Sequence, residues 1–493
     1  MDALVSALND VVWSRPLIFL CLGAGLYFSI RTRFMQVRGF GEMLRLLFRG
    51  ESSAAGVSSF QALAMSLSGR VGTGNIAGVA TAIAFGGPGA VFWMWMVAFL
   101  GASTAYVEST LAQIYKEKDE KGLFRGGPAY YIEKAMGQRW YAWLFAVVTV
   151  IATGLLLPGV QANSIAQGLE NAWGIAPAVT AALVVVALGF IIFGGVKRIA
   201  HFAQVVVPFM ALAYVLVAVV VMLINVDRVP EIFSLIVRSA FGLEAGFGAV
   251  LGLAIEWGVK RGVYSNEAGQ GTGPHHAAAA EVAHPAQQGY VQAFSVYVDT
   301  LLVCSATAFL ILSTGMYNVF GPDGAAIVHA LPGVEVGPGY TQYAVDAMLP
   351  GWGLPFVALA LLFFAFTTIL AYYYMAETNI AYINRKVHRP WLTLALRIGI
   401  LAAVTYGTIR SAEVAWALGD LGVGLMAWLN IIAILILQKP ALKALRHYEA
   451  QRRAGEAPSF DPDALGIENA HYWRQRNAVR PGEDPGAAAG ARE

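Results

Sequence analysis

About eleven apolar segments, each roughly as long as the 20 residues that a helix needs to cross a bilayer, follow one another along this chain. Only 13% of its 493 residues are charged, about half the share found in soluble domains. Backbone amides in hydrocarbon must be paired within the protein, so long apolar segments span as helices. The sequence therefore predicts an all-α, polytopic membrane protein. The segments lie at about 11–30, 56–84, 89–116, 140–169, 177–194, 200–225, 231–264, 286–316, 352–383, 391–409 and 412–437.

Basic residues follow alternate segments, which predicts the orientation of the chain. The loops near 171–176 and 318–350 are almost free of Lys and Arg. Because basic loops stay in the cytoplasm, we expect the N-terminus outside and the C-terminus inside a bacterial-type inner membrane. The basic loop residues are Arg31, Arg33, Arg38, Arg45, Arg49, Lys116, Lys118, Lys121, Arg125, Lys197, Arg198, Arg385, Lys386 and Arg389.

The second apolar segment is interrupted at Ser68–Asn75, which reads Ser-Gly-Arg-Val-Gly-Thr-Gly-Asn. Three glycines in such a short stretch disfavour a continuous helix. Non-helical backbone at membrane depth is tolerated only where it faces protein or a wet cavity. A break exposes N–H groups that favour a carboxylate and carbonyl groups that favour a cation. This stretch is therefore predicted to bind both kinds of ligand.

A second glycine-rich interruption, Leu243–Gly248, lies in the long segment 231–264. About five spans begin with each interrupted segment, and an odd number of spans gives two units of opposite topology. We therefore predict an inverted repeat, with Ser265–Pro274 as a cytoplasmic loop between its moving parts. The predicted parts are an extra N-terminal helix with a basic segment (1–54), two repeats (55–230 and 231–438) and a cytoplasmic tail (439–493). In this tail we expect a basic amphipathic helix over 439–453 and disorder over 478–493.

Four separated motifs resemble signatures of the alanine/glycine–cation symporters. They are Ser68–Gly78 (Ser-Gly-Arg-Val-Gly-Thr-Gly-Asn-Ile-Ala-Gly), Val160–Ala166 (Val-Gln-Ala-Asn-Ser-Ile-Ala), Ser265–Gly269 (Ser-Asn-Glu-Ala-Gly) and Phe364–Ile369 (Phe-Ala-Phe-Thr-Thr-Ile). The resemblance runs from about residue 11 to 437. It implies sodium-coupled, in some members proton-coupled, uptake of small neutral amino acids. It also implies the LeuT-type fold, a five-plus-five inverted repeat with discontinuous helices, here with one extra N-terminal helix. The chain departs from the pattern at Ala371-Tyr372, where most members carry Gly-Trp, a change in the predicted pocket wall.

The LeuT-type resemblance implies a substrate site at both interruptions. Backbone N–H groups at Thr73 and Gly74, next to Asn75, would hold the substrate carboxylate. Gly246 and Phe247 would receive the ammonium group and form a wall. Gln161, a polar residue in the middle of the fourth segment, is a further candidate for substrate contact. The alternative for Gln161 is a hydrogen bond between helices.

The same resemblance implies a sodium site made of neutral oxygens. Its ligands would be the carbonyl groups of Ser68, Val71 and Phe364 and the hydroxyl groups of Thr367 and Thr368. Hydroxyl and carbonyl oxygens suit a hard cation without holding it too tightly to leave. The alternative is that both threonines bond back to their own helix, as threonines in membrane helices do.

Glu108, Asp299 and Arg70 are charged residues within apolar segments, where an unpaired charge is costly. The resemblance implies that Glu108 supports the site from behind by a hydrogen bond to an unwound helix. Asp299 is either a cation or proton partner or pairs with a helix break, and both alternatives stay open. Arg70 is expected to neutralise a buried acid such as Glu244 or Asp420 rather than to bind substrate.

Together these features predict a secondary active symporter that imports alanine or glycine with sodium by alternating access. It would need no cofactor besides the coupling ion and no nucleic-acid partner. Proton coupling on the same fold is the first alternative. A passive channel would lack paired broken helices and sodium-dependent accumulation, and the sequence shows no nucleophile–base or metal set for a membrane enzyme. The oligomeric state and the preference for L- or D-substrates are left open.

Overall fold

A computed structural model describes residues 2–48, 57–120, 122–194, 196–244, 246–385 and 389–478. The helices are α1 (Asp2–Val12), α2 (Arg15–Arg31), α3 (Met35–Arg38), α4 (Phe40–Phe48), α5 (Ser59–Arg70), α6 (Val79–Gly86), α7 (Gly89–Ile114), α8 (Pro128–Met136), α9 (Arg139–Ile151), α10 (Leu157–Trp173), α11 (Pro177–Ile192), α12 (Val196–Ile224), α13 (Val229–Ala240), α14 (Leu251–Asn266), α15 (Gly273–Ala279), α16 (Pro285–Val296), α17 (Ser305–Thr314), α18 (Pro338–Met348), α19 (Gly353–Asn384), α20 (Pro390–Ile409), α21 (Ala412–Ala454) and α22 (His471–Ala478). The strands β1 (Glu117–Lys118) and β2 (Phe124–Arg125) form one antiparallel hairpin, and β3 (Asn318–Phe320) and β4 (Ala326–His329) form another.

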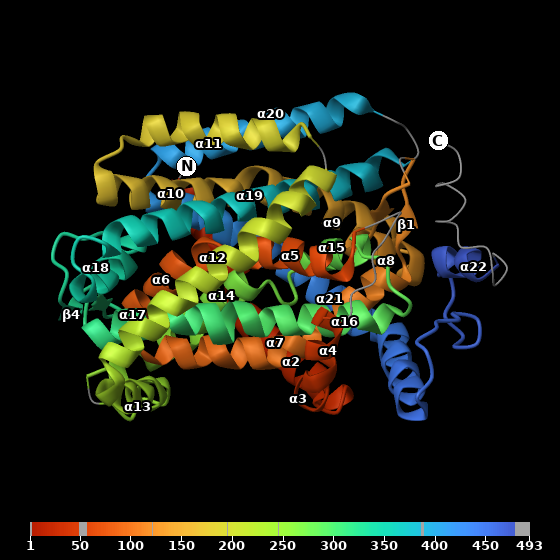
Figure 1. Ribbon diagram of the computed structural model, residues 1–493, viewed down its shortest axis with the longest axis horizontal. Helices are drawn as coiled ribbons and strands as arrows, with labels where there is room; N and C mark the ends of the chain where they lie inside the picture. Colours follow the sequence, from red (N-terminus) through yellow and green to blue (C-terminus); the bar gives the residue numbers. More distant parts are fainter. Residues whose placement is uncertain are drawn as a thin grey trace.

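Most of the long helices run along the longest axis of the molecule (Figure 1). Within the described residues, eight helical stretches are long and apolar enough to cross a membrane, and Gly74–Gly86 and Pro177–Ile192 are shorter apolar helices. Each predicted apolar segment corresponds to one helix or to a run of consecutive helices. The predicted all-α, polytopic membrane architecture is therefore confirmed.

Small residues let the helices approach closely where they cross. A Cβ added to Gly407 of α20 would lie 2.2 Å from the Cα of Gly159 on α10. Such glycine contacts are typical of membrane helices, whose association depends on close packing rather than on burial from water. The pair therefore joins α10, which carries Gln161, to α20 through direct backbone contact.

The first predicted interruption is a true break in a helix. Ser58 caps the start of α5 by accepting a hydrogen bond from the Gln61 N–H. The helix ends at Arg70, and Val71 leaves the helical conformation with φ −77° and ψ 88°. A π-helical segment, Gly74–Gly78, then leads into α6. The glycine-rich backbone thus has its predicted conformation, inside the bundle (Figure 1).

The second predicted interruption is present, but it does not break a helix inside the bundle. It forms the turn between α13 and α14 at one end of the molecule (Figure 1). There α13 packs against the start of α7, where the Trp93 Nε1–H donates to the Ala240 carbonyl at 3.3 Å. The interruption in the bundle is at Glu267–Thr272, between α14 and α15, where Glu267, Gly269 and Gly271 have φ values of 59°, 87° and 82°. Residues 265–274 are all buried. The prediction of a cytoplasmic loop there is therefore wrong, because the glycines allow a left-handed turn between two helices packed inside the protein.

The tail packs against the end of the molecule that carries β1 and β2 (Figure 1). The predicted helix over 439–453 is present as the end of α21. The Trp473 side chain of α22 is buried, and its Nε1–H donates a hydrogen bond to the Gln113 carbonyl at 2.9 Å. The Lys116 Nζ lies 4.1 Å from the centre of the Phe124 ring. Disorder was predicted over 478–493. Ala478 is instead the last residue of α22, and 479–493 lies outside the described residues.

Candidate functional site

The two helix breaks are joined by the carboxylate of Asp299. Asn75, from the first break, donates to its Oδ1 at 2.6 Å. Ser265, near the end of α14, lies 3.0 Å from its Oδ2, which also accepts the Thr300 hydroxyl at 2.6 Å. A buried carboxylate is stable when several donors satisfy it. Of the two alternatives for Asp299, this geometry matches the pairing with a helix break.

Backbone N–H groups of the first break point at side-chain oxygens. The Gly72 N–H donates to Asn75 Oδ1 at 2.8 Å, and the Thr73 N–H donates to Gln161 Oε1 at 3.0 Å. Gln161 Nε2 lies 3.5 Å from the Tyr264 hydroxyl of α14. The structure therefore places Gln161 at the backbone group predicted to hold a carboxylate, so a bound carboxylate would take the place of an amide oxygen.

Two glycines of the first break face different neighbours. A Cβ on Gly72 would lie 2.4 Å from Thr368 Oγ1 and 3.0 Å from Gln161 Oε1. A Cβ on Gly74 would lie 3.1 Å from the Cα of Ser265. Gly72 therefore faces the candidate ligand groups, whereas Gly74 allows the two broken helices to pack closely.

Three of the five candidate sodium ligands meet at the end of α5. The Thr368 hydroxyl lies 2.8 Å from the Ser68 carbonyl and 2.9 Å from the Phe364 carbonyl. Among the described residues, the Thr367 hydroxyl bonds only to the Phe364 carbonyl, at 2.9 Å, which is the alternative expected for a threonine in a membrane helix. Val71 is buried where α5 ends. Thr368 thus connects α19 to the first break, and Thr367 does not.

Glu108 of α7 accepts hydrogen bonds from the second break. Its Oε1 accepts the Gly269 N–H at 3.2 Å, and its Oε2 accepts Asn430 Nδ2 at 2.7 Å. The same Asn430 amide donates to the Gly269 carbonyl at 2.9 Å. Glu108 therefore forms a hydrogen bond to an unwound helix, as the resemblance implies. The unwound stretch is the one between α14 and α15, whereas the predicted stretch was Leu243–Gly248.

The expected partners of Arg70 are wrong. Glu244 lies 3.3 Å from Arg238, and Asp420 forms a bidentate pair with Arg261 at 2.9 and 2.8 Å. Arg70 is buried and instead donates to the Gln292 carbonyl at 3.0 Å and to the Ser295 hydroxyl. The sequence could not predict the partners of Arg70 and Asp420, because Gln292 and Arg261 lie far from them along the chain.

Glu267, the first residue of the second break, is a buried acid that sequence reasoning missed. Its side chain is 1% exposed, and among the described residues neither carboxylate oxygen has a hydrogen-bond partner. Arg70 and Thr272 face it. A Cβ on Gly69 would lie 3.4 Å from its Oε2, so the carboxylate reaches the first break. The signal in the sequence is an acid directly before the glycines of Asn-Glu-Ala-Gly-Gln-Gly.

Aromatic and charged side chains close the site toward the end that carries α1 and the 318–350 region. The Tyr264 and Trp416 rings lie 4.9 Å apart, centre to centre. Beside them, the Arg261 guanidinium lies 4.3 Å from the Trp416 ring and holds Asp420. A cavity of about 720 Å³ lies beside them, lined in part by Arg261, Trp416, Asp420 and Trp257. Tyr264 and Trp416 also contact the first break, since a Cβ on Gly74 would lie 3.2 Å from the Tyr264 ring and one on Gly78 3.7 Å from the Trp416 ring.

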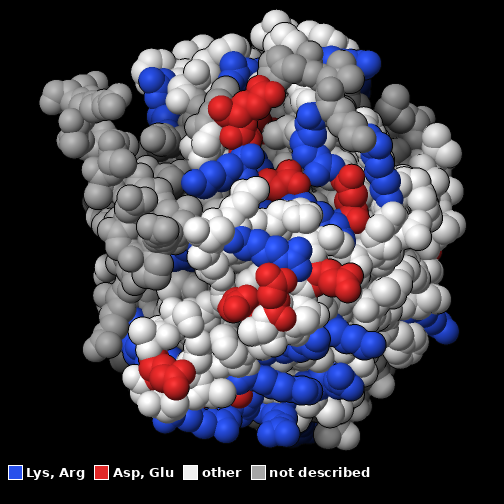
Figure 2. Space-filling model, turned by 90° about the vertical axis from the view of Figure 1, so that its right-hand side faces the viewer, with Lys and Arg blue, Asp and Glu red and all other residues white. Residues whose placement is uncertain are grey.

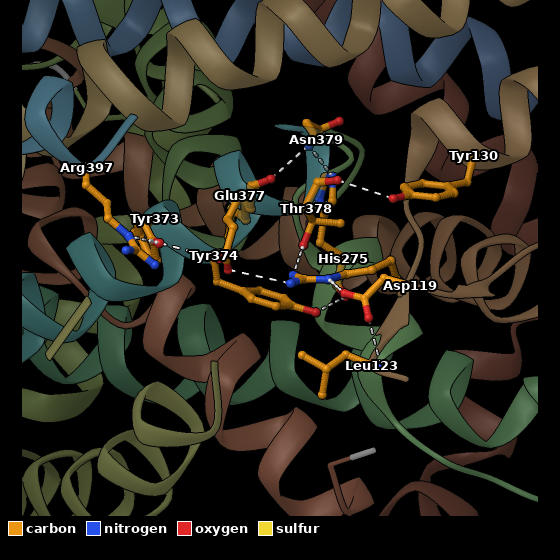
Figure 3. A network of polar contacts seen from close by, with 12 residues as sticks. Asp119, Leu123, Tyr130, His275, Tyr373, Tyr374, Glu377, Thr378, Asn379 and Arg397 are labelled. Carbon is orange, nitrogen blue, oxygen red and sulfur yellow. Dashed lines mark hydrogen bonds and ion pairs between the residues drawn. The ribbon is translucent and has the colours of Figure 1, made fainter. Parts of the chain in front are cut away.

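A polar network closes the opposite end (Figure 3). The buried Arg125 of β2 lies 3.0 Å from Asp119 and donates to the Thr378 hydroxyl of α19 at 3.2 Å. The Asn379 amide lies 2.8 Å from His275 Nε2 of α15. The network therefore joins α19, the β1–β2 hairpin and the second half of the broken helix.

The structure does not bring Gly246 and Phe247 to this site. Gly246 is exposed, and Phe247 packs against Gly87, beyond the end of α6. The eight residues of α6 separate this contact from the first break by about 12 Å of helix. The residues of the second helical segment that lie next to the first break are Tyr264 and Ser265 of α14, which would be 3.2 and 3.1 Å from a Cβ on Gly74.

Two discontinuous helices that face each other inside a bundle of apolar helices define a membrane protein of the secondary-transporter class. Residues 1–462 match the model of the sodium:alanine symporter family. The chain therefore belongs to that family, which confirms the resemblance in its motifs.

Similar proteins come from bacteria and an archaeon. YrbD of Bacillus subtilis (strain 168) is 63% identical over 96% of this chain and 98% of its own. The sodium/proton-dependent alanine carrier protein of Bacillus sp. (strain PS3) is 54% identical over 87% of this chain and 97% of its own. The sodium/alanine symporter AgcS of Methanococcus maripaludis is 35% identical over 92% of this chain and 98% of its own.

Proposed function

We propose that this protein imports alanine, and also glycine, together with sodium by alternating access. The observation that carries the proposal is the meeting of opposite ligand groups at the first break. The Ser68 carbonyl and the Thr368 hydroxyl suit a cation, and the Thr73 N–H suits a carboxylate. The names of the relatives in Bacillus sp. (strain PS3) and Methanococcus maripaludis support alanine and sodium.

In this proposal sodium binds the carbonyl groups of Ser68, Val71 and Phe364 and the hydroxyl of Thr368, whereas the hydroxyl of Thr367, the fifth predicted ligand, stays on the Phe364 carbonyl of its own helix. The amino-acid carboxylate replaces the Gln161 amide oxygen at the Thr73 and Gly74 N–H groups, beside Asn75. Tyr372, which is buried on α19 near Tyr264, limits the side-chain space, and this favours small substrates. One misfit methylene costs only about 1–3 kcal/mol of binding free energy. Affinity would therefore fall stepwise with substrate size, and larger substrates would not be excluded completely.

The access cycle in this proposal follows the LeuT-type inverted repeat, with 1–54 as an extra segment. The Tyr264–Trp416 barrier and the Arg125 network would open in turn, because each closes one end of the bundle. Each ligand would favour the conformation that the other needs, and such coupling is reciprocal. The N-terminus would lie outside and the C-terminus in the cytoplasm of a bacterial-type inner membrane, since the basic loops favour that orientation.

Uptake into proteoliposomes tests the proposal. The purified protein should accumulate radiolabelled alanine transiently above equilibrium under an inward sodium gradient, and an equal potassium gradient should not drive this. Collapse of the sodium gradient with an ionophore should abolish accumulation. A channel would give equilibration alone, with or without sodium, and that result would refute the proposal.

A second candidate, in which a proton can act as the coupling ion, is favoured by Glu267. Three carboxylates and one guanidinium are buried around the breaks, namely those of Glu108, Glu267, Asp299 and Arg70. Glu108 and Asp299 accept several hydrogen bonds, and Glu267 accepts none among the described residues. The Glu267 carboxylate faces the Arg70 guanidinium. Because it accepts no hydrogen bond among the described residues, binding of a proton or a cation would stabilise it further. Glu267 is therefore the candidate proton carrier.

We expect Glu267→Gln to abolish alanine uptake driven by an inward proton gradient without sodium. Sodium-driven uptake should persist, because the amide keeps the shape of the side chain and the proposed sodium ligands lie on α5 and α19. Glu256→Gln, on the same helix but far from the break, should leave both modes unchanged. Proton-driven uptake that survives in Glu267→Gln would exclude this role.

A further inference from the structure

Five arginines converge on one pocket at the end of the molecule that carries the tail. Arg31 ends α2, Arg33 lies in the turn that follows, and Arg38 ends α3. Arg446 and Arg453 come from α21. The pocket has a volume of about 190 Å³. Figure 2 shows this end of the molecule, with Lys and Arg side chains gathered along its lower edge, the side on which Figure 1 places α3, α4 and the end of α21.

A single acid, Glu449, lines the pocket with these arginines. Its Oε1 lies 2.6 Å from Arg38 Nη2, and its Oε2 lies 3.6 Å from Arg453. Five guanidinium groups thus face one carboxylate, and the pocket carries a strong excess of positive charge. Such a pocket attracts an anion with several oxygens, since guanidinium groups bind phosphate through paired hydrogen bonds.

The backbone around α3 holds the arginines in place. Arg33 and Phe34 are consecutive residues with φ values of 56° and 51°, which is uncommon outside glycine and costs energy. Arg38 donates back to the Arg33 carbonyl and to the Thr32 carbonyl, both at 2.9 Å. The pocket is therefore a built feature of this turn and differs from the scattered basic residues of an ordinary membrane-flanking loop.

An apolar groove also borders α3, since Arg38 of this helix lines the pocket and Val37 lines the groove. A neighbouring cavity of about 240 Å³ shares Arg38, Glu449 and Arg453 with it and reaches Tyr290 of α16. One helical turn further along α16, Phe294 lines a groove of about 580 Å³ together with the other apolar side chains Val37, Phe40, Phe99, Val298, Leu301 and Leu302. A charged pocket beside an apolar groove fits a ligand with an anionic head and a hydrocarbon chain.

We propose that this surface binds an anionic phospholipid from the leaflet at this end of the protein. Its phosphate would occupy the arginine pocket, and one acyl chain would follow the groove past Val37 and Phe294. Exposed apolar side chains at Ile30, Phe34 and Val37 lie next to the pocket, so it opens toward the lipid. Basic pockets at the membrane boundary bind such headgroups. This inference does not depend on the transported substrate.

Lipid binding to the purified full-length protein tests this inference. In detergent, native mass spectrometry should show dioleoyl phosphatidylglycerol binding more tightly than dioleoyl phosphatidylcholine. The double substitution Arg446→Gln/Arg453→Gln should weaken phosphatidylglycerol binding roughly 10- to 30-fold, because it removes two charges from the headgroup site. The side chain of Arg453 is 75% exposed, so Arg453→Gln alone provides a variant that keeps the fold and should lose part of the effect.

Two controls make the result specific. Arg139→Gln/Arg389→Gln removes the same charge from exposed residues outside the pocket and should leave binding unchanged. Inorganic phosphate should not displace the lipid, because it lacks the chain that occupies the groove. The inference is overturned if the double variant binds phosphatidylglycerol like the wild type, if the control variant loses it equally, or if phosphate competes fully.

Discussion

Gly72→Ala should reduce sodium-driven alanine uptake to the background of protein-free vesicles. The added methyl group would lie 2.4 Å from Thr368 Oγ1 and 3.0 Å from Gln161 Oε1, where no space exists. Overpacking of this kind forces side chains or backbone to move, and it destabilises the folded protein by about 1–3 kcal/mol. Two groups must move here. They are the Thr368 hydroxyl, which is hydrogen-bonded to the Ser68 carbonyl, and the Gln161 amide oxygen, which accepts the Thr73 N–H. Both proposed ligands would lose their positions together.

Two other glycines serve as controls in the same uptake assay. Gly189→Ala on α11 should behave like the wild type, because nothing lies within 4 Å of the added Cβ. Gly74→Ala should have an intermediate effect, since its Cβ would press on the backbone of Ser265 at 3.1 Å. If Gly72→Ala took up alanine normally at ordinary sodium concentrations, the first break would not be the place where the two ligands bind.

Thr368→Val should raise the sodium concentration for half-maximal uptake by about 10- to 100-fold. The substitution keeps the shape of the side chain and removes the hydroxyl that lies 2.8 Å from the Ser68 carbonyl. A hydrogen bond or ligand contact to a charged group contributes about 1.5–3 kcal/mol, and each 1.4 kcal/mol is a factor of ten. Alanine affinity at saturating sodium should change less, because the proposed ligand of the hydroxyl is the ion.

Thr367→Val is the matched control for this prediction. Its hydroxyl bonds to the Phe364 carbonyl on its own helix, so the sodium requirement should rise by much less. Sodium titrations of initial uptake rates separate the two variants. Unchanged sodium activation in Thr368→Val would rule out the site at Ser68, and equal effects in both variants would assign the hydroxyl pair a shared role in α19.

Local properties of the sequence were enough to predict the helices and the first break. Segment 352–383 was predicted from hydropathy alone, and α19 runs from Gly353 to Asn384. The first break was predicted from three glycines around Arg70, and α5 ends at that residue. Both features depend on backbone propensity and on transfer to lipid, which act within about 20 residues of chain.

The second break could not be chosen from the sequence. Leu243–Gly248 and Glu267–Thr272 are both glycine-rich, and either could interrupt a helix. Only one of them is packed in the bundle, because α14 enters it against α7, where a Cβ on Gly258 would lie 2.6 Å from the Ala90 carbonyl. Packing between distant helices therefore decided which stretch faces the first break.

The sequence by itself determined the membrane class of this protein, the position of its helices, the first break and the family motifs. The tertiary structure decided which partner each buried charge has. Asp420 pairs with Arg261, Glu108 accepts the Gly269 N–H, and Asp299 accepts the Asn75 amide. It also left Glu267 without a hydrogen-bond partner among the described residues. The reason is physical, since hydropathy and backbone propensity are local, whereas a charge buried in a membrane protein is paired by the rotation and packing of helices far apart in the chain.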